Sequence, residues 1–187
     1  MGAKLKRLNI ACGNKYVSSD DNTEWVNLDI DDKDTYGEKI KVDIKWDLEK
    51  FPYPFKDNTF DEIRAWAIIE HISDDKRFIK ELTRITKENG IIDIIVPHFS
   101  HANAFRDPTH KHYYSYESIS FPQLNNGNRV IYKKLRVSYN PIINILSPVI
   151  NLFPKIYDSL FSGMIKCQEI HWKLQVLKKD KIDIIQN

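Results

Sequence analysis

Two apolar runs near the start of the sequence each lead into residues that can contact a ligand. The first run, residues 8–12, turns at Gly13 and Asn14, and the second, residues 25–28, ends at Asp29. Glycine lets the backbone approach a bound molecule closely because it has no Cβ atom, and a carboxylate can bind the hydroxyls of a ribose. This spacing predicts a nucleoside-type cofactor that lies across the carboxyl ends of two parallel strands.

The glycine pattern does not favour a dinucleotide cofactor. A dinucleotide-binding turn carries three glycines in the pattern G-x-G-x-x-G. Here Gly13 is the only one of the three, and Ala11 takes the first position. The pyrophosphate of NAD or FAD therefore has no evident binding loop.

A second group of reactive side chains follows the apolar run at residues 91–96. It contains four histidines, which are His98, His101, His110 and His112. Imidazole changes its charge near neutral pH, and this makes histidine a suitable general base for a hydroxyl or amine acceptor. We take His98, His101 and His110 as the candidate catalytic residues.

The same histidines allow two other interpretations. They could bind a metal together with Asp107, with His98 and His101 as one ligand pair and with His110 and His112 as another. No cysteine or regular helix supports that geometry, so we expect no metal site. The histidines could also simply order a loop that is rich in tyrosine.

The elements that must position these residues alternate along the chain. Apolar patterning predicts strands at about residues 8–12, 25–30, 40–44, 60–66, 91–96, 130–139 and 170–177. Ser73 should cap a helix that stops at residues 89–90. Glu70 and His71 should lie at the helix start and order the site, with His71 packing there and not acting in catalysis. The connection at residues 14–24 has room for about one or two helical turns. This alternation predicts a doubly wound α/β sheet.

The overall composition is that of an ordinary globular chain. The sequence has 187 residues and a net charge of +2, with 42% hydrophobic and 29% charged residues, which does not suggest a disordered or membrane-embedded protein. Its length fits a single domain over residues 1–187. Two cysteines are too few for a disulfide framework, and no apolar run is long enough to span a bilayer, so we expect a cytoplasmic location.

An apolar segment at about residues 141–166 interrupts the strand pattern. Its central part, residues 142–165, is rich in isoleucine, leucine and phenylalanine and is broken by Pro148 and Pro154. It could form a lid, pack against the sheet, or contact a membrane surface, a partner or a second copy of the chain. Nucleic acid is not favoured as a partner, because the basic residues are not interleaved with a stacking platform.

Several segments, taken in order, resemble the motifs of class I S-adenosylmethionine-dependent methyltransferases of the short methyltransferase type 11-like kind. Residues 8–15 resemble the first motif, and residues 25–30 resemble the second, whose acid binds both ribose hydroxyls. Residues 47–48 resemble the segment that holds the adenine amino group. Residues 58–63, followed by 69–72, are similar to the fourth strand and the helix start after it.

The resemblance covers roughly residues 5–120 and implies S-adenosylmethionine as the cofactor. The cofactor-binding residues that it implies are Ala11, Cys12, Gly13, Asn14, Asp29, Ile30, Asp47, Leu48 and Ala65. Asp43 is an alternative to Asp47 if the register differs slightly. The resemblance also implies a Rossmann-like seven-stranded sheet of order 3-2-1-4-5-7-6, with a C-terminal antiparallel hairpin.

The acceptor of the methyl group is not specified by the sequence. Small molecules, sugars and lipid-linked molecules are all compatible with the resemblance. Two departures from the family pattern, Asn9 in place of an acid and Ala11 in place of a glycine, keep a different function open. In this alternative, the chain is a catalytically degenerate binding module that docks a partner through the apolar segment.

Overall fold

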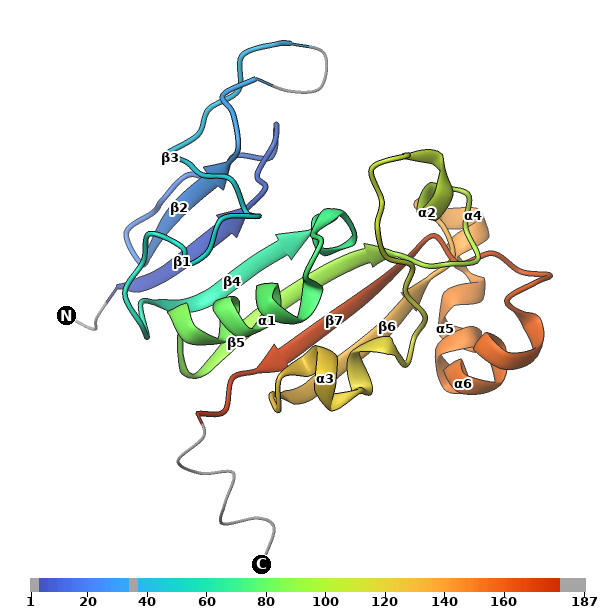
Figure 1. The fold of residues 1–187 in the computed structure, drawn as a ribbon. Helices are drawn as coiled ribbons and strands as arrows, with labels where there is room; N and C mark the ends of the chain where they lie inside the picture. The colour runs from blue at the N-terminus through green and yellow to red at the C-terminus, as the bar shows by residue number, and fades with distance from the viewer. Residues whose placement is uncertain (1–3, 34–36, 179–187) are drawn as a thin grey trace, which may run out of the picture.

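Seven strands form one mixed sheet in the order β3-β2-β1-β4-β5-β7-β6 (Figure 1). The computed structural model describes residues 4–33 and 37–178. The strands are β1 (Leu5–Ile10), β2 (Thr23–Asp29), β3 (Ile44–Lys45), β4 (Phe60–Trp66), β5 (Thr86–Pro97), β6 (Arg129–Arg136) and β7 (Glu169–Gln175). Strands β1 to β5 are parallel, and β7 is antiparallel to both of its neighbours. The strand order and the antiparallel hairpin are confirmed.

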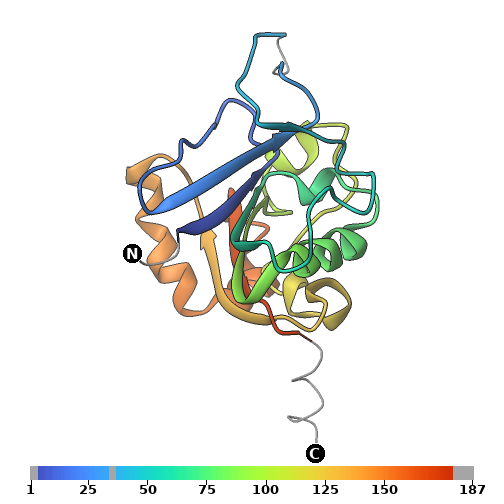
Figure 2. The same cartoon turned by 90° about the vertical axis from the view of Figure 1, so that its left-hand side faces the viewer.

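Among the described residues, α1 (Asp75–Ile85) is the longest helix. The shorter helical segments are η1 (Ile69–His71), α2 (Asn103–Arg106), η2 (Ser118–Ser120), α3 (Pro122–Asn125), α4 (Pro141–Asn144), α5 (Leu146–Leu152), α6 (Pro154–Ile156) and the π-helical η3 (Tyr157–Phe161). Figure 2 shows α1 and α3 on one side of the sheet, and the orange helices α4 to α6 on the other side. The second group lies at the β6 end only.

The face of the sheet under α1 is apolar and forms the core. Alternation along the strands places Leu8, Ile63 and Ile92 on this face, and all three are fully buried. Helix α1 packs four apolar residues at helical spacing into the same core, namely Phe78, Ile79, Leu82 and Ile85. Each such side chain contributes roughly 1.5–3 kcal/mol when it is removed from water.

The opposite face of β1, β2 and β4 carries charged and aromatic side chains. The guanidinium of Arg64 lies 4.9 Å from the ring centroid of Trp25 and 4.2 Å from that of Trp66. The guanidinium of Arg7 also lies over Trp25, 5.5 Å from its ring centroid. Cation–π stacking therefore buries Trp25 on a face that no described helix covers at this end of the sheet.

An extended loop connects β1 to β2, and residues 11–22, all of which the structure describes, contain no helix. Two buried amides hold this loop on the polar face of the sheet. Asn9 donates to the carbonyl oxygen of Lys15 at 2.9 Å. Asn27 donates to the carbonyl oxygen of Val17 and accepts from its N–H, both at 2.9 Å. Asn9 thus holds the loop in place through its hydrogen bond to Lys15. The one or two helical turns that the length of this connection allows do not form.

The predicted third strand is too long. Instead of residues 40–44, only Ile44 and Lys45 pair with β2. The reason lies in Asp43, whose carboxylate accepts from both the backbone N–H and the side-chain amide of Asn27, at 2.8 and 3.0 Å. The Asp43 carboxylate therefore occupies the backbone N–H of Asn27, which would have to bond to a backbone carbonyl oxygen if β3 began earlier.

Both predicted ends of α1 are also wrong. Asp74, not Ser73, caps the helix, because the Asp74 carboxylate accepts from the N–H of Arg77 at 2.9 Å. The helix ends at residue 85, and Gly90 lies inside β5. A Cβ atom at Gly90 would lie 2.9 Å from the carbonyl oxygen of Asp61. This glycine therefore permits the close approach of β4 and does not end the helix.

Strand β6 lies at the edge of the sheet and is covered by α5. Asn151 accepts from the N–H of Leu135 at 2.8 Å and donates to the carbonyl oxygen of the same residue at 2.7 Å. The amide thus pairs a backbone edge that would otherwise be open. The apolar segment at residues 141–166 is the connection between β6 and β7, and it includes α4, α5, α6 and η3.

Candidate active site

Asp29 draws the loop after β1 onto the end of β2. Its carboxylate accepts from the N–H of Gly13 at 2.8 Å and from that of Ile30 at 2.7 Å. Ala11 and Gly13 both have a left-handed backbone, with φ values of +52° and +49°. Nothing lies within 4 Å of the position that a Cβ atom on Gly13 would occupy. The loop therefore leaves an open, backbone-lined space beside a carboxylate.

Asp47 lies just beyond the carboxyl end of β3, and β3 is the neighbour of β2, which ends at Asp29. Asp29 pairs with Lys45, two residues before Asp47. The Asp47 side chain is partly exposed and accepts from the N–H of Glu49 at 3.0 Å. Asp43 is turned toward Asn27 instead. The structure therefore favours Asp47 over Asp43 as the second carboxylate at this edge.

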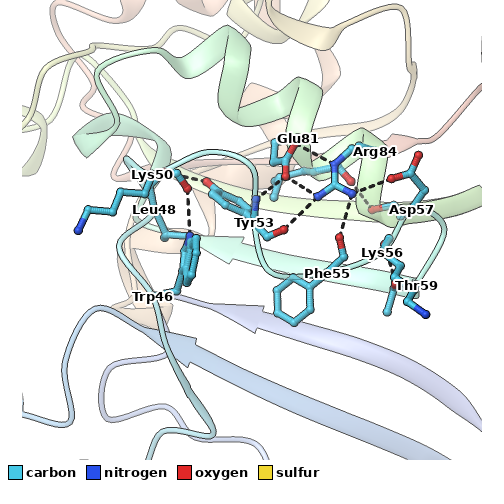
Figure 3. Close-up of polar contacts among 12 residues, drawn as sticks. Trp46, Leu48, Lys50, Tyr53, Phe55, Lys56, Asp57, Thr59, Glu81 and Arg84 are labelled. Carbon is cyan, nitrogen blue, oxygen red and sulfur yellow. Dashed lines mark hydrogen bonds and ion pairs between the residues drawn. The ribbon is translucent and has the colours of Figure 1, made fainter.

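Arg84 of α1 holds the segment that follows Asp47 (Figure 3). Its guanidinium donates to four groups, which are the carbonyl oxygens of Tyr53 and Phe55 and the carboxylates of Asp57 and Glu81. The Tyr53 hydroxyl in turn donates to the carbonyl oxygen of Leu48 at 3.0 Å. The planar, five-donor guanidinium suits such a set of acceptors. The loop between β3 and β4 is therefore tied to the core helix.

Three of the residues that the resemblance implied, Cys12, Leu48 and Ala65, have buried side chains. Leu48 and Ala65 belong to the hydrophobic core, whereas the Cys12 sulfur lies 3.9 Å from the carbonyl oxygen of Lys41. Burial, together with the charge of Asp29, raises the pKa of the Cys12 thiol to about 11, which leaves it protonated and unreactive at neutral pH. Ile30, in contrast, is exposed at the end of β2.

These residues fit an adenosine-type ligand that carries no phosphate. Asp29 and Asp47 offer carboxylate oxygens to hydroxyl and amino groups, and Asp29 retains lone pairs beyond its two backbone partners. Exposed Ile30 offers an apolar surface to a base. Gly13 leaves room for the remainder of the ligand.

A second hollow, here called the polar cleft, lies beyond the carboxyl ends of β4 and β5. It has a volume of about 620 Å³, and its lining includes Ala67, Glu70, His71, Asn103, Arg106 and His110. Ile10 of β1 pairs with Ala65 of β4, so the loop after β1 and the wall of the polar cleft adjoin each other. The sheet thus places a polar hollow beside the carboxylate-lined loop.

The side-chain carboxyl group of Glu70 stands in the wall of the polar cleft without a hydrogen-bond partner. Its side chain is 1% exposed, and neither carboxylate oxygen is paired. Burial raises the pKa of Glu70 to about 7, with a further contribution from the charge of Asp107. Buried carboxyl groups in proteins are nearly always paired, so an unpaired one calls for an explanation.

The neighbours of the two cleft histidines determine which ring nitrogen of each is the hydrogen-bond donor. Nδ1 of His110 lies 2.8 Å from the carbonyl oxygen of Ala104, so this nitrogen is the donor. The Thr109 hydroxyl donates to Asp107 at 2.7 Å and therefore accepts from Nδ1 of His71 at 2.8 Å. Burial, reinforced by His110, holds the pKa of His71 below its usual value. In the neutral form of each ring, these contacts place the proton on Nδ1 and the free lone pair on Nε2.

Of the three histidines that we take as catalytic candidates, His110 alone lines the polar cleft. His98 is fully buried, and both of its ring nitrogens are engaged, one of them by Asp158 at 2.8 Å. Nδ1 of His101 accepts from the N–H of Asn103 at 3.1 Å, at the start of α2. His98 and His101 therefore have structural contacts in this arrangement.

From the sequence, Glu70 and His71 are expected to lie at a helix start and to order the site, not to contact a ligand themselves. The structure places both in the polar cleft. A signal was present, because they follow β4 directly, and ligands in open α/β sheets bind beyond the carboxyl ends of strands. What the sequence could not show is that Glu70 is buried and unpaired.

The strand order, with β7 antiparallel, and the carboxylates after β2 and β3 define the class I S-adenosylmethionine-dependent methyltransferase fold. A family model described as "Methyltransferase domain" matches residues 5–94. The chain thus has the fold of this class, and its N-terminal half matches the family's methyltransferase domain. The resemblance seen in the sequence is confirmed, and S-adenosylmethionine is the cofactor of this class.

Solved structures share this fold at low sequence identity. A SAM-dependent methyltransferase from Archaeoglobus fulgidus has a TM-score of 0.64 and 20% identity, over 92% of this chain and 86% of that chain. One from Aquifex aeolicus has a TM-score of 0.56 and 16% identity, over 94% and 85%. The [4+2]-cyclase SpnF has a TM-score of 0.60 and 15% identity, over 92% and 74%, so the fold by itself does not establish methyl transfer. No curated protein matches the sequence.

Proposed function

We propose that the protein transfers the methyl group of S-adenosylmethionine to a hydroxyl group of a small polar acceptor, such as a sugar. The observation that carries this proposal is the position of the polar cleft beside the loop at Gly13. When bound at that loop, the cofactor supplies an electrophilic methyl group. The polar cleft then holds the acceptor next to it, and positioning of the two reactants provides most of the rate acceleration.

In this proposal, Asp29 and Asp47 bind the hydroxyl and amino groups of the nucleoside. The backbone of residues 11–14 surrounds the methionine part, where Gly13 leaves open space. Ile30 packs against the base. Arg84 acts on this site indirectly, because it holds the loop that follows Asp47 (Figure 3).

The lining of the polar cleft supports a hydroxylated acceptor. Glu70, His71 and His110 offer lone pairs, and Asn103 and Arg106 offer N–H donors. His110 contacts the acceptor in this proposal, whereas His98 and His101 support the loops around it.

Calorimetry with S-adenosylmethionine and S-adenosylhomocysteine tests the cofactor site directly. We expect binding of one molecule per chain. A panel of sugars and other polyols, assayed for release of S-adenosylhomocysteine, then tests the acceptor class. No binding at millimolar cofactor would contradict the proposal and favour the catalytically degenerate alternative.

The apolar segment at residues 141–166 supports contact with an anionic membrane surface, which suits a lipid-linked acceptor. In α5, the exposed residues Leu146, Val149 and Leu152 follow each other at a spacing of three and so share one face, while Ile150 is buried. Ile142 and Met164, elsewhere in the segment, are also exposed, at 81% each. Monomeric proteins seldom leave such a surface uncovered.

The charges around this segment suit anionic lipid. Lys155 and Lys166 are exposed, although Lys155 also pairs with Glu117 at 3.5 Å. The single acid of the segment, Asp158, is turned inward to His98. No helix in the described part of the chain is long and apolar enough to cross a bilayer. Contact would therefore be at the surface of the membrane.

Co-sedimentation with vesicles tests this contact. We expect binding to vesicles that contain phosphatidylserine, weaker binding to pure phosphatidylcholine, and loss of binding in the variant Val149→Glu. A matched control is Ile131→Glu, which changes an exposed apolar residue outside the segment. Absence of vesicle binding, together with a dimer in analytical ultracentrifugation that Val149→Glu dissociates, would show that the segment serves self-association instead.

A further inference from the structure

We propose that Glu70, His71 and His110 form a binding site for a divalent transition-metal ion, with Zn²⁺ as the best match, in the wall of the polar cleft. Each side chain offers one ligand atom, and these atoms lie within 4.8 Å of one another. Two imidazoles and one carboxylate are a ligand set that zinc uses in catalytic sites. The site uses the same three side chains that the proposed function gives to the acceptor, but its test is metal binding and not methyl transfer, so the two proposals can fail separately.

The unpaired carboxyl group of Glu70 is the first observation behind this site. A cation would supply the partner that both of its oxygens lack. Lys111, the residue after His110, does not do so, because its ammonium is bound by Glu49 at 2.6 Å and by Ser73 at 2.8 Å. Arg106 lines the polar cleft, yet it makes no hydrogen bond to Glu70.

The second observation is the orientation of the two histidines. In each ring, Nδ1 is anchored by an oxygen atom, from Ala104 for His110 and from Thr109 for His71. Metal-binding histidines in proteins are typically held in this way, because the anchored nitrogen fixes the ring and leaves the other nitrogen as a lone pair. The two ring centroids lie 4.6 Å apart at an interplanar angle of 76°.

The third observation is that the two segments carrying these residues are fixed to each other. The carbonyl oxygen of Glu70 accepts from the N–H of Lys111 at 2.7 Å and from that of His112 at 3.3 Å. This backbone contact joins η1, which carries Glu70 and His71, to the loop that carries His110. The ligand set therefore does not need a large rearrangement to assemble.

A bound ion would need a modest contraction of the cluster. Zinc–ligand distances of roughly 2.0–2.2 Å place neighbouring ligand atoms about 3.4 Å apart in a tetrahedral site. Rotation of the side chains can provide the difference from 4.8 Å. Three protein ligands leave one coordination position open to the polar cleft. If the proposed function holds, a hydroxyl oxygen of the acceptor occupies this position and becomes more acidic there.

Metal titration of the intact chain tests the site. The protein is treated with a chelator, dialysed, and titrated with Zn²⁺ by calorimetry and with Co²⁺ by visible absorbance, which reports the coordination geometry. We expect one ion per chain. Glu70→Gln and His110→Ala should each weaken binding by about 10-fold to 100-fold. The matched control His112→Ala, outside the cluster, should bind as the wild type does.

Thermal melting with and without Zn²⁺ checks that each variant is folded and gives a second readout. Zn²⁺ should raise the Tm of the wild type and of His112→Ala, and it should not raise that of Glu70→Gln. Binding of less than one ion in five chains, or binding that neither cluster variant weakens, would overturn the metal site. Cofactor calorimetry on the metal-free protein tells the two proposals apart, because S-adenosylmethionine binding does not require the ion.

Discussion

The two sides of the sheet's carboxyl edge are built in different ways. On the cofactor side, formed by the loops after β1, β2 and β3, the central contact joins Asp29 to Gly13, which is 16 residues away. On the cleft side, formed by the loops after β4 and β5, the supporting contacts come from distant segments. Asp158 binds His98 across 60 residues, and Glu49 binds Lys111 across 62. The first side is thus fixed by local chain geometry, and the second by tertiary contacts.

The two sides also differ in how their carboxyl groups are paired. Each oxygen of Asp29 already accepts from a backbone N–H, so the cofactor side is internally complete before a ligand adds to it. Both oxygens of Glu70 lack a partner. On the cleft side, the carboxyl group of Glu70 is therefore available to bind a ligand. Changes on one side should leave binding on the other side intact, and this can be tested.

The largest expected effect is on the cofactor side. Asp29→Ala should weaken S-adenosylmethionine binding at least 100-fold, about 2.7 kcal/mol, and abolish methyl transfer. The variant removes the proposed ribose acceptor and also leaves the N–H groups of Gly13 and Ile30 without their partner. Calorimetry with the cofactor measures the loss, and the Zn²⁺ titration should be unchanged.

Asp21→Ala serves as the control for Asp29→Ala, because Asp21 is an exposed acid in the loop before β2. It should bind the cofactor as the wild type does. If Asp29→Ala weakened the cofactor less than fivefold, the nucleoside would not be bound where we place it. If the variant also lost Zn²⁺, the two sides would be coupled, and the comparison above would fail.

This contrast explains how much could be predicted from the sequence. The parallel strands and the place of Asp29 at the end of one of them were predictable, because apolar runs that end in a glycine or an acid are local patterns. The strand order was predictable only from the resemblance to the methyltransferase family. The end of α1 was not predictable, because Gly90 is required by the carbonyl oxygen of Asp61 on another strand. The burial of His98 was not predictable either, since its partner Asp158 lies 60 residues away in the apolar segment.

The second prediction removes the anchor of the apolar segment. Asp158 accepts from Nε2 of His98 at 2.8 Å and from the N–H of Tyr116 at 2.9 Å. Asp158→Ala leaves both groups unpaired in a largely buried place, which should lower the free energy of unfolding by about 1–3 kcal/mol. Denaturant titration measures this loss. Limited proteolysis should then cut within residues 141–166 sooner than in the wild type.

Asp158→Asn is the matched variant, since it keeps one acceptor oxygen and the size of the side chain. It should recover part of the stability. Cofactor affinity should not change in either variant, because the anchor belongs to the cleft side. A cofactor affinity that fell in proportion to the loss of stability would show that the segment also supports the cofactor side.

The third prediction concerns Glu49, which joins the two sides. Its carboxylate, on the loop after β3, accepts from Ser73 and from Lys111 of the cleft side. Burial alone would raise the pKa of Glu49, but these partners outweigh it and hold the pKa below its usual value of 4.5. The stabilisation is therefore present above about pH 4.5 and is lost as the pH falls through the lowered pKa.

Glu49→Gln should remove this contribution, about 1 kcal/mol at pH 7 for a charge-assisted contact near the surface. Unfolding free energies measured at pH 7 and pH 3.5 should therefore differ less in the variant than in the wild type. Glu24→Gln is the control, because Glu24 makes only an exposed ion pair with Lys6. An equal pH dependence in the wild type and Glu49→Gln would mean that this bridge does not contribute to stability.

The smallest expected effect gives the most direct comparison of the two sides. Ala11 follows β1 and Ala67 follows β4, and both have a left-handed backbone, with φ values of +52° and +51°. Side chains with a Cβ atom disfavour this conformation by roughly 1–2 kcal/mol, and the greater freedom of glycine in the unfolded chain offsets part of the gain. Ala11→Gly and Ala67→Gly should each stabilise the fold by about 0.5 kcal/mol.

Only one of these two variants should affect the cofactor. Ala11→Gly relaxes the loop that contacts the methionine part, so cofactor affinity should rise about two- to fivefold, or roughly 0.4–1 kcal/mol. Ala67→Gly acts on the wall of the polar cleft and should leave cofactor affinity unchanged. Calorimetry on both variants decides the question. Equal gains in affinity would mean that the two loops respond as one unit, and the division of the carboxyl edge into a cofactor side and a cleft side would have to be abandoned.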